Sequence, residues 1–242
     1  MIRIAKPEDI NMITKLLCEA FDIDDDINDV LSMISPLENT FVYENEGEVI
    51  SIASAIPFTS GDKKGRYIYA VTTDINHRGK GYAGVMLEHI INYFSGKVDV
   101  VMLKPAEKTL FDFYRKNGFN DEIYADVKEI VFNGNDVPEK ISFEEYKEER
   151  KKYTDFSFPE NVMEYYFNAY EYCALKGDDY LVLYRKLQNR CVIDEIYGDF
   201  YKINPAIFEG LNCEAVLEGK EVYALAHFYG GKFNINFRVP ME

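Results

Sequence analysis

The sequence predicts a mixed α/β (α+β) fold built around a mixed sheet. Short runs rich in β-branched and aromatic residues alternate with amphipathic helical patterns, which is the order expected of strands and helices packed in layers. Of the 242 residues, 47% are hydrophobic and 29% are charged, as in ordinary globular proteins. No apolar run approaches the ~18 residues of a membrane-spanning helix, so we expect no membrane segment.

The first residues predict a strand followed by two helices. Residues 2–5 form the strand pattern, and Asp9 is expected to cap a helix. A second helical repeat covers residues 27–34. The first helix has an apolar stripe at i, i+3, i+4, i+7 and i+8, made of Ile13, Leu16, Leu17, Ala20 and Phe21.

The next segment predicts three strands and then a helical crossover. The turn Asn45-Glu46-Gly47 separates two expected strands, 40–43 and 49–57, and a third covers 67–73. Glycines follow two expected helices, as C-terminal caps do. These later elements are a helix through Phe94 closed by Gly96, a strand over 98–103, a helix over 109–117 closed by Gly118, and a strand over 127–132.

Beyond a linker-like stretch at 133–140, the pattern restarts, which divides the chain into domains 1–134 and 135–242. The second domain is expected to hold a helix, a hairpin and two further strands. Their ranges are 159–175, 180–184 with 191–197, 222–228 and 233–237.

Charge and cysteine content narrow the classes of function. The chain has 42 acidic and 27 basic residues, a net charge of −15, which argues against nucleic-acid binding and allows a cationic substrate. The four cysteines form no CxxC pair. This favours reduced thiols in the cytoplasm over a disulfide framework or a metal site.

The strongest chemical signal follows the expected strand 67–73. Glycines at alternate positions free the main-chain N–H groups, and the first turn of a helix adds free donors and a partial positive charge. Such a loop suits a phosphate or pyrophosphate. It consists of Arg78, Gly79, Lys80, Gly81, Tyr82, Ala83 and Gly84.

This loop, as Arg78-x-x-Gly81-x-Ala83, resembles the acyl-CoA signature R/Q-x-x-G-x-G/A of the GNAT (Gcn5-related) N-acetyltransferase family. The stretch 110–119, LFDFYRKNGF, is similar to the FYxxxGF helix end of that family. The two motifs occur in the family's order, with a helix, a strand and a helix between them. The resemblance covers about residues 1–134.

The resemblance implies an acetyl-CoA-dependent N-acetyltransferase in which a primary amine attacks the thioester directly. The pantetheine arm would pair with Val71, Thr72 and Thr73, and the pyrophosphate would lie on the N–H groups of residues 79–84. Tyr114 would be the general acid for the leaving thiolate. The acceptor would be a small-molecule or peptide amine. The proton-accepting base stays open among Asp74, His77 and acids near the second helix.

Other interpretations of the same residues stay open. Gly79, Gly81 and Gly84 also fit the G-x-G-x-x-G of a dinucleotide-binding oxidoreductase. The domain could bind acyl-CoA without catalysis, and Tyr114 could be a packing residue. The acidic cluster 22–26 lacks the glycine and glutamate of a calcium loop, so it is either favourable charge at a helix start or a mouth for a cationic acceptor.

The second domain has no R-x-x-G-x-G/A motif. Its hairpin is similar to the second and third strands of a GNAT domain, which suggests a tandem arrangement with a degenerate second half. An unrelated α+β cap is the alternative. Such a half could complete the sheet, cover the acceptor cleft or make a homodimer contact.

Overall fold

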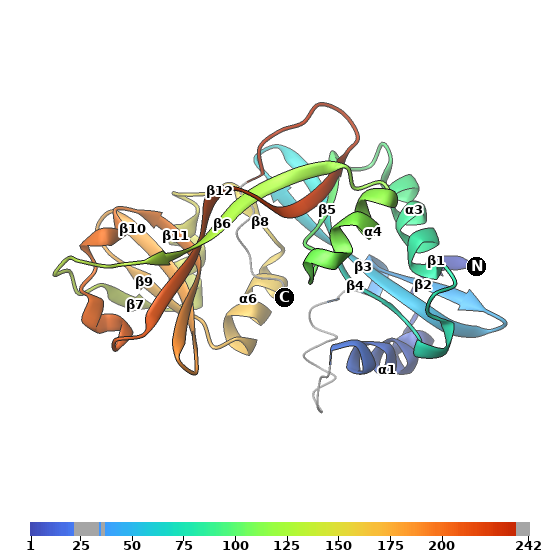
Figure 1. The fold of residues 1–242 in the computed structure, drawn as a ribbon, viewed down its shortest axis with the longest axis horizontal. Helices are drawn as coiled ribbons and strands as arrows, with labels where there is room; N and C mark the ends of the chain where they lie inside the picture. The colour runs from blue at the N-terminus through green and yellow to red at the C-terminus, as the bar shows by residue number, and fades with distance from the viewer. Residues whose placement is uncertain (22–33, 35–36, 236–242) are drawn as a thin grey trace. The chain divides into compact units, whose positions relative to one another are not determined.

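The computed structural model describes residues 1–21, 34 and 37–235, and these form two compact units (Figure 1). The first unit contains Met1–Ile123, Ser157–Val162 and Ala224–Asn234; the second contains Tyr124–Phe156 and Met163–Tyr223. Two strands contribute to both units, β6 (Asp121–Ile130) and β12 (Asn212–Phe228). The expected second helix and the acidic cluster 22–26 lie outside the described residues, except for Ile34. No helix in the described part of the chain has the length and hydropathy needed to cross a membrane.

The sheet of the first unit has the order β1-β2-β3-β4-β5-β12, and its neighbours are antiparallel except β4 and β5, which are parallel. Helices α1 (Ile10–Phe21), α3 (Tyr82–Phe94) and α4 (Phe111–Lys116) belong to the same unit. The strands are β1 (Ile2–Ile4), β2 (Thr40–Asn45), β3 (Glu48–Ser60), β4 (Lys63–Thr73) and β5 (Val100–Leu103). This mixed sheet confirms the predicted fold class.

The hairpin between β2 and β3 turns where the sequence predicts it. Glu46 and Gly47 both have positive φ, 52° and 88°. Two such residues match the right-handed twist of the flanking strands, which is why an Asn-Glu-Gly stretch closes this hairpin tightly.

Helices cover the two faces of this sheet because side chains alternate along each strand. Val42 faces the core cluster that contains Ile13 and Leu16 of α1. Its neighbour Phe41 faces the other way and packs edge-on against Phe94 of α3, with ring centroids 5.9 Å apart. Figure 1 shows α1 and α3 on opposite sides of strands β2–β4.

Strand β4 changes its pairing partway along its length. It pairs with β5 only from Gly65–Val100 to Tyr67–Met102. Beyond this point its register with β3 shifts, and Ala70 takes a positive φ of 55°. A β-bulge bends the strand and increases its twist, so the C-terminal half of β4 separates from β5.

The second unit repeats much of this topology with other residues. Its strand order is β7-β9-β10-β11-β12, antiparallel except for the parallel pair β11–β12, and β10–β11 also has a register shift. Two 3-10 turns, Phe200–Lys202 and Pro205–Phe208, stand where the first unit has α3. The elements are β7 (Glu139–Ile141), α5 (Phe143–Arg150), β8 (Phe156–Ser157), α6 (Glu160–Ala169), β9 (Cys173–Lys176), β10 (Tyr180–Leu187) and β11 (Arg190–Gly198).

A buried ion pair stabilises the second unit between α5 and β11. Arg150 and Glu195 are both buried, and Nη2 of the arginine lies 2.7 Å from Oε1 of the glutamate. The Tyr146 hydroxyl donates to the same carboxylate at 2.7 Å. Burial opposes the charge of Glu195, but Arg150 and these hydrogen bonds leave its pKa below the usual value. The carboxylate therefore remains ionised inside the core.

Some local expectations are wrong. Asp9 does not cap α1; its carboxylate accepts from Lys6 N at 2.8 Å and pairs with Arg3, because a 3-10 turn precedes the helix. The helix predicted over 159–175 ends at Ala169, since 173–176 pair with β10 as a strand. The stretch Phe233–Ile235 is not a strand, and residues 236–237 lie outside the described part.

Candidate active site at the end of β4

The glycine loop after β4 is held open by its backbone. Gly79 and Gly81 have φ values of 76° and 86°, in the left-handed region that favours glycine. A Cβ added at either position would meet no described atom within 4 Å. Arg78 ties the loop to the strand, because its Nε donates to the carbonyl of Thr73 at 3.0 Å. The loop surface is therefore free of the protein's own side chains at these glycines.

Helix α3 begins directly after this loop and points its first turn at the same space. Gly81 is the N-cap residue, and its carbonyl accepts from Val85 N at 3.1 Å. Within the described ranges, the N–H groups of Tyr82, Ala83 and Gly84 have no acceptor. Free donors and the helix dipole at one point make a site for an anion such as a diphosphate.

The second motif meets the first one at Gly84. A Cβ on Gly84 would lie 2.6 Å from Oδ1 of Asn117, the residue that ends α4. The Nδ2 of Asn117 donates to the Phe113 carbonyl at 2.8 Å, which fixes the amide in place. The glycine therefore allows the C-terminal end of α4 to approach the first turn of α3 closely.

Tyr114 lies on α4, one turn before Asn117. Its carbonyl accepts from the N–H groups of Asn117 and Phe119, at 3.0 and 3.2 Å. Its ring packs edge-on against Phe113 and Phe119. Its hydroxyl has no hydrogen-bond partner among the described residues, and burial raises the pKa of the phenol above 10. The group therefore stays protonated at neutral pH and is free to donate.

The residues Val71, Thr72 and Thr73 form the end of β4. Thr72 and Thr73 pair with Ile52 and Ser51 of β3, so one edge of the strand is satisfied. Their other edge has no partner in β5, whose pairing with β4 ends at Tyr67. An unpaired strand edge accepts an extended ligand by main-chain hydrogen bonds.

Asp74 and His77 form a polar pair between β4 and the loop. Nδ1 of His77 lies 3.1 Å from Oδ1 of Asp74, which also accepts from Asn76 N at 2.8 Å. The hydrogen bond from His77 holds the pKa of Asp74 below its usual value. The other two histidines have packing roles: burial lowers the pKa of His89, and Nδ1 of His227 lies 2.9 Å from the Gly118 carbonyl.

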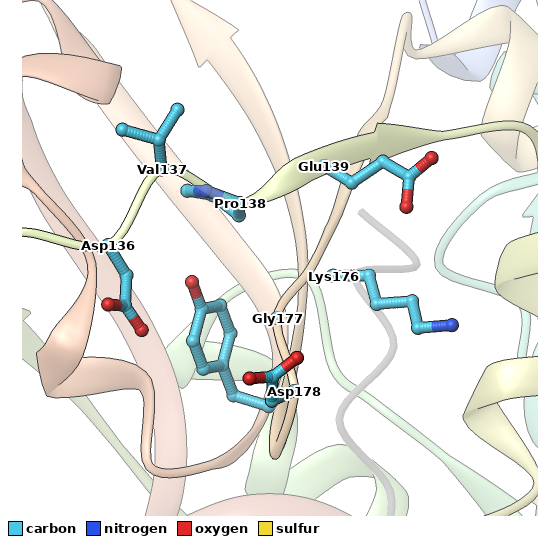
Figure 2. A pocket seen from close by; sticks show the side chains of 8 residues that line it. Asp136, Val137, Pro138, Glu139, Lys176, Gly177 and Asp178 are labelled. Carbon is cyan, nitrogen blue, oxygen red and sulfur yellow. The ribbon is translucent and has the colours of Figure 1, made fainter.

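The second unit has a hollow of about 370 Å³ with a negative lining. Figure 2 shows the side chains of Asp136, Glu139 and Asp178 around it, with Lys176 at one side. The lysine is paired with Glu149 at 3.0 Å. The described residues contain no group of three or more His, Cys, Asp or Glu side chains placed to hold a metal. None of the sequence-predicted site residues lines this hollow.

Sequence reasoning missed two features of the site. Nothing in an Ala-Val pair marks Ala70 as a bulge with positive φ, which is uncommon for a residue with a side chain. The Gly84–Asn117 approach joins residues 33 positions apart, and only the folded chain brings them together. The glycine spacing does predict the open backbone of the loop, because a positive φ at Gly79 and Gly81 depends on local sequence alone.

Comparisons with known proteins agree with this geometry. Residues 1–121 match the model of the acetyltransferase (GNAT) domain. The fold is similar to that of a GCN5-related N-acetyltransferase from Anabaena variabilis, with a TM-score of 0.74, 14% identity, and 95% of this chain and 73% of that chain covered.

Two further solved structures are similar. A GCN5-related N-acetyltransferase from Kribbella flavida has a TM-score of 0.70 and 11% identity, over 94% of this chain and 70% of that chain. Eis1 from Mycobacterium abscessus has a TM-score of 0.69 and 11% identity, over 95% of this chain and 74% of that chain. No curated protein matches the sequence. Identities this low establish a shared fold alone.

Proposed function

The chain belongs to the GNAT acetyltransferase family, and from this we propose that it transfers an acetyl group from acetyl-CoA to a primary amine. The family and the fold support an acyltransferase function. Acetyl-CoA as donor and an amine as acceptor are our proposal. The single observation that carries it is the open glycine loop at the N-terminus of α3, next to the unpaired edge of β4.

The loop and the strand edge suit the two chemical parts of a CoA donor. The diphosphate would accept hydrogen bonds from the first-turn N–H groups of α3, where Gly81 leaves room. The pantetheine arm, which carries amides, would pair with Val71–Thr73 as an added strand. The thioester would then enter the gap that opens between β4 and β5 beyond Tyr67.

Tyr114 would stabilise the leaving thiolate by hydrogen bonding. Transfer of a proton from a phenol of pKa ~10 to a thiolate of pKa ~8.5 costs ~2 kcal/mol. Burial raises the pKa of Tyr114, so complete transfer costs more than this. The useful role of the hydroxyl is therefore to donate a hydrogen bond as negative charge develops on sulfur.

The acceptor amine must lose a proton to a base before it can attack the thioester. An alkyl ammonium of pKa ~10.4 loses a proton at pH 7 at a cost of about 4.6 kcal/mol. We propose the Asp74–His77 pair as the group that receives it, directly or through water. Asp74 stays ionised because its pKa is lowered, and it would stabilise the imidazolium that forms on His77.

For the second unit we propose a degenerate GNAT-like half. Its antiparallel strands β9, β10 and β11, followed by a parallel pair with β12, repeat the order β2 to β5. The position of the glycine loop and α3 is taken by two 3-10 turns, which offer no helix N-terminus to a diphosphate. The bulge in β11 is filled by Asp194, which accepts from the Tyr172 hydroxyl and pairs with Arg185.

A non-catalytic acyl-CoA-binding module is the competing function, and one experiment separates the two. Thiol release from acetyl-CoA is followed with a thiol reagent over a panel of primary amines. In parallel, calorimetric titration of the protein with CoA measures binding. Turnover with any amine, above the rate of hydrolysis, supports the transferase. Tight CoA binding with no turnover on the whole panel supports the module, and no CoA binding refutes both.

A further inference from the structure

The hollow of the second unit contains a buried hydroxyl that has no hydrogen-bond partner among the described residues. Tyr180, the first residue of β10, lines this hollow of about 370 Å³ and is only 1% exposed. Its hydroxyl is the unpartnered group. A buried polar group without a partner costs about 1–3 kcal/mol, so proteins pair such groups with their own atoms, with water or with a ligand. Because the hollow has the size of a small-molecule site, the hydroxyl is a candidate contact for a small ligand.

The Tyr180 hydroxyl lies between the two segments that line the hollow. On one side is the turn that joins β9 to β10, since a Cβ on Gly177 would lie 2.3 Å from Cζ, the ring carbon that carries the hydroxyl. On the other side is the segment 136–138. Burial raises the pKa of the phenol, and Asp136 is the carboxylate that raises it most. The phenol therefore stays protonated at neutral pH, and its oxygen has lone pairs to accept an N–H donor.

Each of these two segments brings one carboxylate to the hollow. The backbone of Asp136 is fixed, because its N–H donates to the Lys202 carbonyl at 2.9 Å and its carbonyl accepts from Asn204 N at 2.8 Å. Asp178 stands in the turn between β9 and β10, and its charge also raises the pKa of the Tyr180 phenol. Neither carboxylate forms an ion pair or a side-chain hydrogen bond with any residue in the described part of the chain. The hollow thus combines an unpartnered hydroxyl with two unpaired negative charges.

Lys176 lines the hollow from the opposite face of the sheet and does not neutralise these carboxylates. Its neighbour Leu175 belongs to the core cluster that contains Tyr180, and adjacent residues of a strand point to opposite faces. On that opposite face Lys176 pairs with Glu149 at 3.0 Å. Glu139 is directly opposite Lys176 in the β7–β9 register and therefore shares its face. Figure 2 shows the Glu139 and Lys176 side chains extending to the same side.

The other nearby cation already has its own counter-charges. Lys202 lowers the pKa of the Tyr180 phenol, so its charge reaches the hydroxyl. Its Nζ lies 2.6 Å from Oδ2 of Asp179 and 3.2 Å from Oδ2 of Asp199. The two carboxylates of the hollow therefore remain available to a positively charged ligand.

We propose that this hollow binds a short alkyl diammonium ion, which donates N–H groups to the Tyr180 hydroxyl and to the carboxylates of Asp136 and Asp178. Carboxylates only accept hydrogen bonds and an ammonium only donates them, so the two sets match. Two unpaired carboxylates on separate segments favour two positive charges over one. Val137 and Pro138 also line the hollow and offer apolar surface to the alkyl chain.

An organic cation fits this hollow better than a metal ion. The described residues hold no group of three or more His, Cys, Asp or Glu side chains placed to bind a metal. All the residues that carry the proposal belong to the second unit. The proposal does not depend on acetyl transfer by the first unit.

The test titrates the full chain with 1,4-diaminobutane and follows binding by calorimetry and by amide NMR shifts. Salt at about 0.15 M screens unspecific attraction of cations to an acidic protein. We expect saturable binding that perturbs the amides of residues 136–139 and 177–180. The bis(trimethylammonium) analogue keeps both charges but donates no N–H, so it should bind at least about 10-fold more weakly. The neutral 1,4-butanediol should show no saturable binding.

Variants separate a ligand contact from a packing role. Tyr180→Phe removes a hydroxyl that no described residue bonds, so Tm should not fall, while the affinity for 1,4-diaminobutane should fall at least about 10-fold. Asp136→Asn and Asp178→Asn each remove one exposed charge and should each weaken binding about 5-fold. Glu171→Gln removes an exposed carboxylate of the same unit outside the lining, and it should leave the affinity unchanged.

Four results would overturn the proposal. They are the absence of saturable binding, equal binding of the bis(trimethylammonium) analogue, NMR shifts confined to the first unit, and full affinity in Tyr180→Phe. A lower Tm in Tyr180→Phe would also overturn it, because the hydroxyl would then be bonded within the protein.

Discussion

Replacement of Gly81 by aspartate tests the proposed donor site most directly. The position has a φ of 86°, and a Cβ added there would meet no described atom within 4 Å, so the new side chain has room. A non-glycine residue in this conformation costs about 1–2 kcal/mol. Aspartate at a helix N-cap recovers a few tenths of that. We therefore expect Gly81→Asp to fold and to lose about 2–4 °C in Tm.

The expected loss of CoA affinity is much larger than this loss of stability. A carboxylate about 5 Å from two diphosphate charges repels them by ~1.7 kcal/mol even in water. Loss of one charge-assisted hydrogen bond to a main-chain N–H adds about 1.5–3 kcal/mol. Together these terms predict a reduction in CoA affinity of at least about 100-fold. Calorimetric titration with CoA at fixed ionic strength measures it.

Gly47 provides a matched control, because its φ is 88° and its surroundings are equally open, but it lies in the β2–β3 turn. Gly47→Asp should show a similar change in Tm with unchanged CoA affinity. Gly81→Asn introduces a side chain of the same shape without the charge, and it should reduce the affinity for CoA by only about 10-fold. A folded Gly81→Asp that binds CoA like the wild type would refute the assignment of the loop.

The remaining predictions concern Tyr114, Asp9 and Glu195. Tyr114→Phe should lower kcat by about 10- to 100-fold with little change in acetyl-CoA affinity, in steady-state kinetics with a competent amine; an unaltered kcat would make Tyr114 a packing residue. Because burial raises the pKa of Tyr114, deprotonation of this phenol should not lower kcat below pH ~10, and a loss near pH 8 that disappears in Tyr114→Phe contradicts this. The hydrogen bond from Arg3 lowers the pKa of Asp9 in the folded protein. The ionised Asp9 carboxylate therefore stabilises the folded state fully above its unfolded pKa of ~3.9, and this stabilisation is lost as the pH falls through the lower pKa of the folded state. Asp9→Asn should therefore lower the free energy of unfolding in urea at pH 7, by about 1–3 kcal/mol, and this deficit should shrink as the pH falls below ~3.9; a deficit that stays constant down to the acid transition would show that the ion pair is not the cause. Glu195→Gln leaves the buried Arg150 without its counter-charge and should cost about 3–5 kcal/mol in urea unfolding, whereas a cost below 1 kcal/mol would indicate that solvent reaches the pair.

The predicted elements that the structure confirms are those fixed by local patterns. The β2–β3 turn follows from Glu46-Gly47, and α3 follows from an apolar stripe between a glycine loop and Gly96. Expectations failed where distant pairing competed with local preference. Residues 173–176 have a helical spacing but pair with β10, because the backbone hydrogen bonds of a sheet depend on its neighbours.

The sequence by itself determined the two motifs, their order and the loop backbone that would hold a diphosphate, because glycine spacing and helix periodicity act over a few residues. Only the tertiary structure decided that β4 leaves β5 after Tyr67 and that Gly84 lets α4 approach α3. Each of these depends on residues far apart in the chain, whose contact is set by sheet register and packing.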